Sequence, residues 1–192
     1  MENFIYIYLI AIIILLGYIY YDSYHTDLVK ETSSVDGKMY LVRNLPDKKE
    51  AADLIASVKE KLVKLVDYLE NKYPNDPRVE RMVINFKPDK IMESTPDSKY
   101  TSYSVNKGEK VVLCLRSRNS KEELVEENVL MFVALHEMAH ICTKSIGHTD
   151  EFWTNFKWLL QKSIEIKIYT KQDFRKNPQE YCGTTITDSP LR

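Results

Sequence analysis

Cysteine is scarce in this sequence. Its 192 residues include only three cysteines, Cys114, Cys142 and Cys182. They are too few and too widely separated for a disulfide-rich scaffold, and no CxxC pair indicates a zinc knuckle. This usage is typical of a reducing compartment, and one disulfide with a spare thiol stays open as the alternative.

An excess of charge of one sign is also lacking. The chain carries 27 basic and 28 acidic residues, a formal net charge of -1 at pH 7. Basic residues gather between positions 167 and 176, but acidic neighbours dilute them, as is typical of a solvated face. The sequence has no stripe that combines basic and aromatic residues, so we predict no clear nucleic-acid binding.

The N-terminal segment has no charged residue from position 4 to position 21 (FIYIYLIAIIILLGYIYY). As a helix it would be about 27 Å long, close to the hydrocarbon thickness of a bilayer. A cleaved signal peptide and a buried core helix are the alternatives, but the basic start and the A-x-A-like site of a signal peptide are missing. We expect residues 4–21 to form a transmembrane anchor. Lysines only on its C-terminal side favour a cytoplasmic domain.

The rest of the chain is expected to form one domain. Residues 22–38 are polar and include Gly37, which is typical of a juxtamembrane linker, so the domain would span residues 39–192. Because no βαβ alternation is present, the pattern predicts an α+β fold. The expected elements are a helix over 47–73, a strand over 82–86, a hairpin over 100–105 and 110–116, helices over 121–146 and after 150, and an irregular tail from 169.

The motif His136-Glu137-Met138-Ala139-His140 is an HExxH sequence within an apolar helix. Positions i and i+4 share one helix face, so both imidazoles can reach a single ion, and neutral imidazole suits Zn²⁺. Glu137 could take a proton from a zinc-bound water, whose pKa the metal lowers to about 7. A chance match is the alternative, but burying these groups without a partner would be costly.

A catalytic zinc site needs a third protein ligand. His148 is the first candidate, because it directly follows Gly147, where the helix is expected to end and the chain can turn sharply. Glu165 on the downstream helix is the alternative. Asp150 and Glu151 are further options.

The motif and the later run Gly147-His148-Thr149-Asp150-Glu151-Phe152-Trp153 together resemble the WLM and SprT-like zincin metalloproteases. The resemblance covers roughly residues 80–160. It implies that His136, His140 and His148 bind zinc and that Glu137 is the catalytic base.

The same resemblance implies further features of the site. Phe152 and Trp153 would pack beneath the metal, and the strand Val111–Leu115 would be the edge along which an extended peptide lies. The Ile-, Lys- and Tyr-rich chain is also similar to zincin-like proteins of large DNA viruses, which would place it in a virion or its membrane.

Two functional hypotheses follow. The first is a membrane-anchored zinc metallopeptidase that hydrolyses peptide or protein substrates with a water activated by Glu137. The alternative is a zincin-fold structural or scaffold protein of a membrane or virion with little or no activity. The intact Glu137 favours the peptidase, since a structural zinc site has no need of that carboxylate.

Tyr100, Tyr103 and Tyr181 could each donate a hydrogen bond to an oxyanion.

Overall fold

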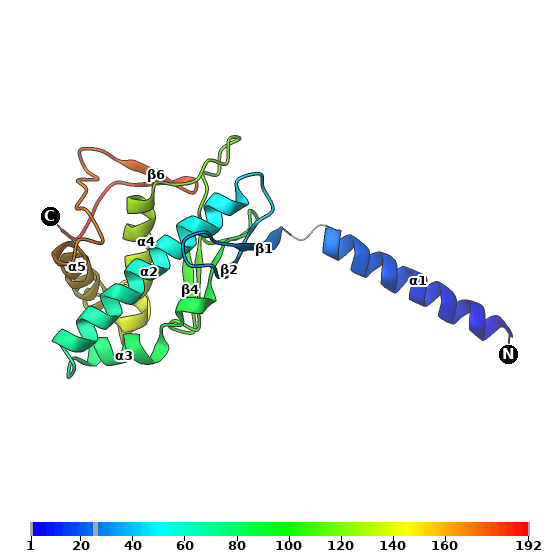
Figure 1. Cartoon of the computed structure of the whole chain (residues 1–192), viewed down its shortest axis with the longest axis horizontal. Coiled ribbons are helices and arrows are strands. Elements are labelled where there is room, and N and C mark those ends of the chain that lie inside the picture. The colour runs from blue at the N-terminus through cyan, green and yellow to red at the C-terminus, as the bar shows by residue number, and fades with distance from the viewer. Residues whose placement is uncertain (1, 25–26, 192) are drawn as a thin grey trace.

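The computed structural model describes residues 2–24 and 27–191, with side chains described for residues 6–20 and 27–191. Helices and strands are segregated along the chain, and the fold is α+β (Figure 1). The elements are α1 (Glu2–Tyr24), β1 (Leu28–Thr32), β2 (Met39–Arg43), α2 (Lys48–Lys72), α3 (Pro77–Asn85), the short 3₁₀ helix η1 (Pro88–Lys90), β3 (Ile91–Glu93), β4 (Tyr103–Val105), β5 (Lys110–Leu113), α4 (Glu127–Cys142), α5 (Asp150–Glu165), β6 (Gln179–Tyr181) and β7 (Thr184–Ile186).

The helix α4 lies at the centre of the domain, in contact with α2, α3 and α5. It is apolar around its whole circumference, as expected for a helix that other elements cover on most sides. The helix α2 buries the apolar stripe that its three- and four-residue spacing predicts, together with Lys59, which pairs with Asp36. Its buried leucines and isoleucine are Ile55, Leu62, Leu65 and Leu69. The HExxH motif is therefore built into the core of the domain.

A three-stranded sheet has the order β3-β5-β4. The strand β5 pairs in parallel with β3 and antiparallel with β4, so the predicted hairpin is confirmed. Its turn requires Gly108, which has a φ of +117° and whose added Cβ would lie 2.8 Å from the carbonyl oxygen of Asn85. The expectation that Val111–Leu115 forms the edge is wrong, because β5 is the central strand. The edge strand of this hairpin is β4.

The segment expected to be a strand at residues 82–86 belongs instead to the helix α3. Asp76 caps this helix by accepting a hydrogen bond from the N–H of Arg78, and Pro77 occupies its first turn. Val79 and Met82 are buried one helical turn apart, while Val83 and Ile84 are exposed. The β-favouring residues thus end a helix whose start is set by its cap.

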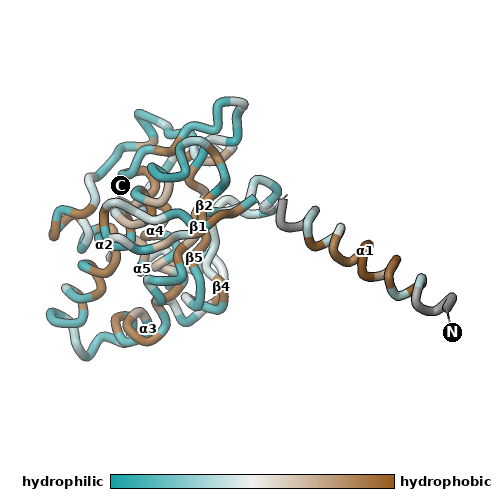
Figure 2. Tube along the Cα trace, turned by 45° about the vertical axis from the view of Figure 1, so that its right-hand side comes forward, coloured by the Kyte–Doolittle hydropathy of each residue, from teal (hydrophilic) through white to brown (hydrophobic). Residues whose placement is uncertain are grey.

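The N-terminal helix α1 extends away from the domain (Figure 1). Its described side chains at residues 6–20 are all exposed, and Figure 2 shows by colour that the helix is largely apolar. Within the described residues, however, no helix has both the length and the apolar character needed to cross a hydrocarbon core about 30 Å thick. The expectation of a transmembrane anchor at residues 4–21 is therefore not supported. Residues 22–38, expected to be a linker, include β1, which pairs with β2.

A disulfide joins Cys114, just after β5, to Cys182 in the C-terminal segment. The segment expected to be an irregular tail therefore contains the small hairpin β6–β7 and is linked covalently to the sheet. The Tyr181 hydroxyl adds a 2.9 Å hydrogen bond to the carbonyl oxygen of Cys114. Cys142 is buried as a free thiol. Of the two cysteine alternatives, the structure has one disulfide and one spare thiol.

Removing this disulfide is expected to destabilise the domain substantially. The two cysteines are 68 residues apart, and loss of a cross-link across a loop of that length costs about 4 kcal/mol in the chain-entropy description. Cys182→Ser should therefore melt well below the wild type without reductant, and the difference should shrink in dithiothreitol. Thiol titration of the unfolded, unreduced wild type should find one thiol per chain. Three thiols there would contradict the disulfide.

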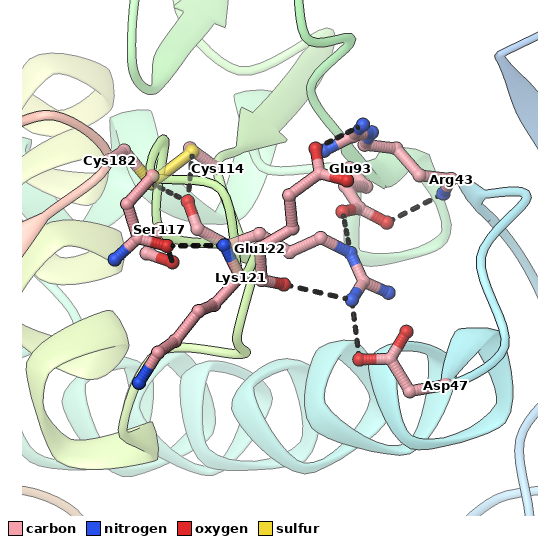
Figure 3. A network of polar contacts seen from close by, with 10 residues as sticks. Arg43, Asp47, Glu93, Cys114, Ser117, Lys121, Glu122 and Cys182 are labelled. Atoms are coloured by element: carbon pink, nitrogen blue, oxygen red, sulfur yellow. Dashed lines mark hydrogen bonds and ion pairs between the residues drawn. A yellow bond between two sulfur atoms is a disulfide. The ribbon is translucent and has the colours of Figure 1, made fainter.

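An ionic network around the buried Arg116 connects the segment after β5 to the rest of the domain. Figure 3 shows its partners Asp47 and Glu93 with the neighbouring Arg43. The Nε of Arg116 donates to Glu93 at 2.9 Å, and its Nη1 reaches Asp47 at the start of α2 at 2.5 Å. Glu93 also accepts a 2.6 Å hydrogen bond from the backbone N–H of Arg43. Arg116 and Glu93 are both almost fully buried, and this burial raises the pKa of the Glu93 carboxyl group although Arg116 and the N–H of Arg43 act to lower it. The network holds β2, β3, α2 and the end of β5 together.

Candidate metal centre

The helix α4 presents His136 and His140 one turn apart, as the motif predicts. Its C-terminal end is held by basic side chains, which suit the unpaired carbonyls there. Arg81 Nε donates to the carbonyl oxygen of Cys142 at 2.6 Å. Lys107, in the β4–β5 turn, donates through Nζ to the carbonyl oxygens of Thr143 and Ser145 at 2.6 and 2.7 Å.

The loop after α4 brings His148 back to the two motif histidines. Glu151 accepts hydrogen bonds from the N–H groups of Lys144 and Ser145 at 3.1 and 3.0 Å. Gly147 takes a φ of +82°, and Thr149 caps α5 by accepting from the N–H of Phe152. The chain therefore turns sharply enough for His148 to face α4.

Three ring nitrogens converge at one point. The Nε2 atom of His140 lies 3.2 Å from those of His136 and His148, which are 3.0 Å from each other. Two nitrogens bound to one tetrahedral Zn²⁺ at 2.0–2.1 Å would be about 3.3 Å apart. The donor set and its spacing therefore fit a zinc ion.

The other candidate ligands lie elsewhere. Glu165 is in the last turn of α5, where it binds Tyr68, Lys72 and Lys162. Glu151 accepts a hydrogen bond from the backbone N–H of Ser145 in the loop. The group of possible metal ligands found among the described residues contains neither Glu151 nor Asp150. Glu165, Asp150 and Glu151 are therefore not brought to the three histidines.

Burial keeps the motif histidines in the protonation state that a metal needs. Desolvation lowers the pKa of His136 to about 3 and that of His140 to about 4, so both rings are neutral near pH 7. Phe152 packs against the three rings, with centroid distances of 4.8, 4.3 and 4.7 Å to His136, His140 and His148. Of the three histidine rings, Trp153 contacts only that of His148, with the ring centroids 5.7 Å apart, and Trp153 is 44% exposed.

Glu137 lies in the same cleft as the histidines. It is 4% exposed, and this burial raises its pKa to about 7, against the lowering effect of hydrogen bonds from the hydroxyl and the N–H of Ser104. The cleft has a volume of about 330 Å³ and is bordered by β4, the β4–β5 turn and the loop that carries His148. A buried carboxylate that titrates near neutral pH can act as a general base. The sequence pattern did not indicate Ser104.

The three candidate tyrosines occupy different environments. Tyr181 is buried, and its hydroxyl is bonded to Ser102 and to the carbonyl oxygen of Cys114. Tyr100 is 58% exposed and contacts the ring of Tyr103. Of the three tyrosines, only Tyr103 lines the cleft, where it lies beside Ser102 and Ser104.

Residues 35–191 match the family model of the WLM domain. The chain belongs to the WLM family. The predicted resemblance to WLM proteins is thus confirmed, and the chain contains a metalloprotease-type domain.

Several viral proteins are similar to this WLM chain. The uncharacterised protein R325 of Acanthamoeba polyphaga mimivirus is 38% identical over 164 residues, which cover 83% of each chain. The uncharacterised protein 042R of Invertebrate iridescent virus 3 is 43% identical over 84 residues, 43% of this chain and 49% of that protein.

A solved structure shows the same fold. The crystal structure of a Wss1 mutant from Saccharomyces cerevisiae aligns with a TM-score of 0.50 at 22% identity, and the alignment covers 66% of this chain and 87% of that one. A second Wss1 crystal structure gives a TM-score of 0.48 at 24% identity, over 64% of this chain and 83% of that one.

Proposed function

We propose that this WLM domain is a zinc-dependent metallopeptidase, in which His136, His140 and His148 hold Zn²⁺ and Glu137 is the catalytic base. The observation that carries this proposal is the convergence of three Nε2 atoms within 3.2 Å, beside a buried glutamate in the same cleft. Three imidazole ligands leave one position of a tetrahedral ion for water or substrate, as catalytic sites require.

Residues of the chain would carry out the proton transfer and the positioning that peptide hydrolysis also requires. Zinc, when bound, supplies Lewis acidity and makes water a stronger nucleophile near pH 7. Glu137 accepts the proton that the attacking water loses and passes it to the leaving amide nitrogen. Ser104 orients the carboxylate through its two hydrogen bonds. Tyr103, which lines the cleft, would donate a hydrogen bond to the developing oxyanion.

The edge strand β4 provides a place for the substrate backbone. It borders the cleft through Tyr103 and Ser104, and only β5 pairs with it among the described strands. An extended peptide can add to such an edge through main-chain hydrogen bonds, which give affinity with little dependence on sequence. This arrangement supports a peptide or protein substrate.

The relatives support a viral setting. R325 is a protein of a mimivirus, and 042R is a protein of an iridescent virus. The proposed peptidase would accordingly act as a viral protein.

Metal removal tests the proposed activity directly. The purified chain should cleave members of a mixed peptide library, and a chelator such as 1,10-phenanthroline should abolish the cleavage because the three histidines alone supply no Lewis acid. Adding zinc back should restore it, whereas magnesium should not, since imidazole ligands do not suit magnesium. Cleavage that survives complete removal of the metal would contradict the proposal.

A further inference from the structure

A second cavity lies beside His136, next to α5. Its volume is about 630 Å³, within the range of about 300–1,000 Å³ that small-molecule and side-chain sites occupy. Phe132 of α4 and Trp153 and Phe156 of α5 form one wall, and Ser189 and Pro190 of the C-terminal segment form another. In Figure 1 the C-terminus lies next to α5, in agreement with this arrangement.

The cavity is suited to an apolar guest. Phe132 and Phe156 are buried with their ring centroids 5.1 Å apart, while the ring of Trp153 remains 44% exposed. Aromatic walls favour another ring through offset or edge-to-face contacts. The acidic residue in the lining, Asp188, is paired with Arg175 at 3.0 and 3.2 Å. The other charged residue of the lining, Lys157, is exposed. The buried residues of the lining, Phe132 and Phe156, are aromatic, which suits a neutral, apolar side chain.

His136 connects this cavity to the metal centre. It lines both the 630 Å³ cavity and the cleft that contains Glu137, His140 and His148. A peptide whose carbonyl group lies at the metal would therefore have a neighbouring side chain at the mouth of the aromatic cavity. The walls come from α4, α5 and the C-terminal segment, so the guest would be covered on several sides.

We infer that this cavity is the specificity pocket of the enzyme and binds a bulky apolar side chain, preferably aromatic, next to the scissile bond of the substrate. The inference rests on the proposed peptidase function and adds the substrate class. Burying a Phe side chain in place of Ala should strengthen binding by about tenfold or more.

A binding experiment tests the pocket independently of turnover. Zinc-loaded Glu137→Gln protein is titrated with blocked glycine-rich pentapeptides that carry Phe, Leu or Ala at the centre, and binding is followed by tryptophan fluorescence and calorimetry. We expect the Phe peptide to bind at least about tenfold more tightly than the Ala peptide. Equal affinities for the three peptides would overturn the inference.

Filling the cavity provides the matched control. Thr154 is an exposed member of its lining, so Thr154→Trp should remove the preference for Phe. Gln161→Trp places the same side chain on the same helix outside the lining and should leave the preference intact. If Thr154→Trp does not fold, Ser189→Phe obstructs the pocket from the opposite wall. A preference that survives both obstructions would also overturn the inference.

Cleavage by the wild type separates this inference from the proposed function. A library should be cut next to Phe, Tyr, Trp or Leu, and the kcat/KM for such peptides should exceed that for Ala peptides by at least about tenfold. Efficient cleavage with no such preference would overturn the pocket but leave the peptidase standing. Absence of all cleavage, together with selective binding of the Phe peptide, would support the pocket and contradict the peptidase.

Discussion

Glu137→Gln is expected to reduce kcat for peptide hydrolysis by a factor of about 10² to 10⁴ while the protein keeps its zinc. The amide keeps the size of the carboxyl group but cannot accept the proton from the attacking water. The three converging imidazoles are unchanged by this substitution, so metal content should stay near one ion per chain. Steady-state kinetics and elemental analysis on the same preparation measure both quantities.

The matched control for this variant is Glu126→Gln. Glu126 is an exposed glutamate at the start of the same helix, and its side chain makes no capping hydrogen bond. Its replacement should leave both kcat and zinc content unchanged. If Glu137→Gln retained full activity, Glu137 would not be the catalytic base. If the wild type bound zinc but cleaved no peptide, the domain would instead fit the scaffold hypothesis, in which zinc serves only stability.

His140→Ala is expected to abolish both tight zinc binding and the stabilisation that zinc provides. One of the three converging nitrogens is then missing, and two imidazoles do not make a complete protein site. A ligand present at 100 times its Kd stabilises the folded state by about 2.7 kcal/mol. The wild type should therefore melt at a clearly higher temperature with zinc than with chelator, and the variant should show almost no difference.

His25→Ala provides the comparison for the histidine variants, since His25 is the remaining histidine of the chain and lies outside both the HExxH motif and the run from Gly147 to Trp153. It should bind zinc and respond to it like the wild type. His148→Ala should behave like His140→Ala, because its Nε2 atom is as close to the other two. Undiminished zinc binding by His148→Ala would show that the third ligand is a different residue.

The sequence allowed prediction of the parts of the site that depend on local spacing. The positions of His136 and His140 follow from helical periodicity, and the turn at Gly147 correctly suggested that His148 returns to the helix. The periodic apolar stripe likewise predicted α2 well. In these cases neighbouring residues in the chain determine the geometry, so local patterns are sufficient.

Features that depend on contacts between distant segments were not predictable in the same way. A helix was expected over residues 121–146, but α4 spans only Glu127–Cys142. Instead, the N–H of Val125 bonds to the carbonyl oxygen of Leu115 at 2.8 Å, and Leu124 forms a bridge with Arg116. These bonds hold the chain extended beside the end of β5 until Glu127.

The pairing of cysteines and the order of strands have the same origin. One disulfide among three cysteines allows three pairings, and only the packing of the C-terminal segment selects Cys114 with Cys182. The role of Ser104 depends on β4 lying beside α4, which no local pattern encodes. The strand β5 is central because β3 pairs with it on the side opposite β4, and local sequence patterns do not predict this pairing.

The most direct test of the metal centre is an anomalous difference map from crystals of the zinc-loaded protein, with data collected on both sides of the zinc absorption edge. The account predicts one strong peak about 2.0–2.1 Å from the Nε2 atoms of His136, His140 and His148. The absence of a peak there, or a peak held by other residues, would contradict it.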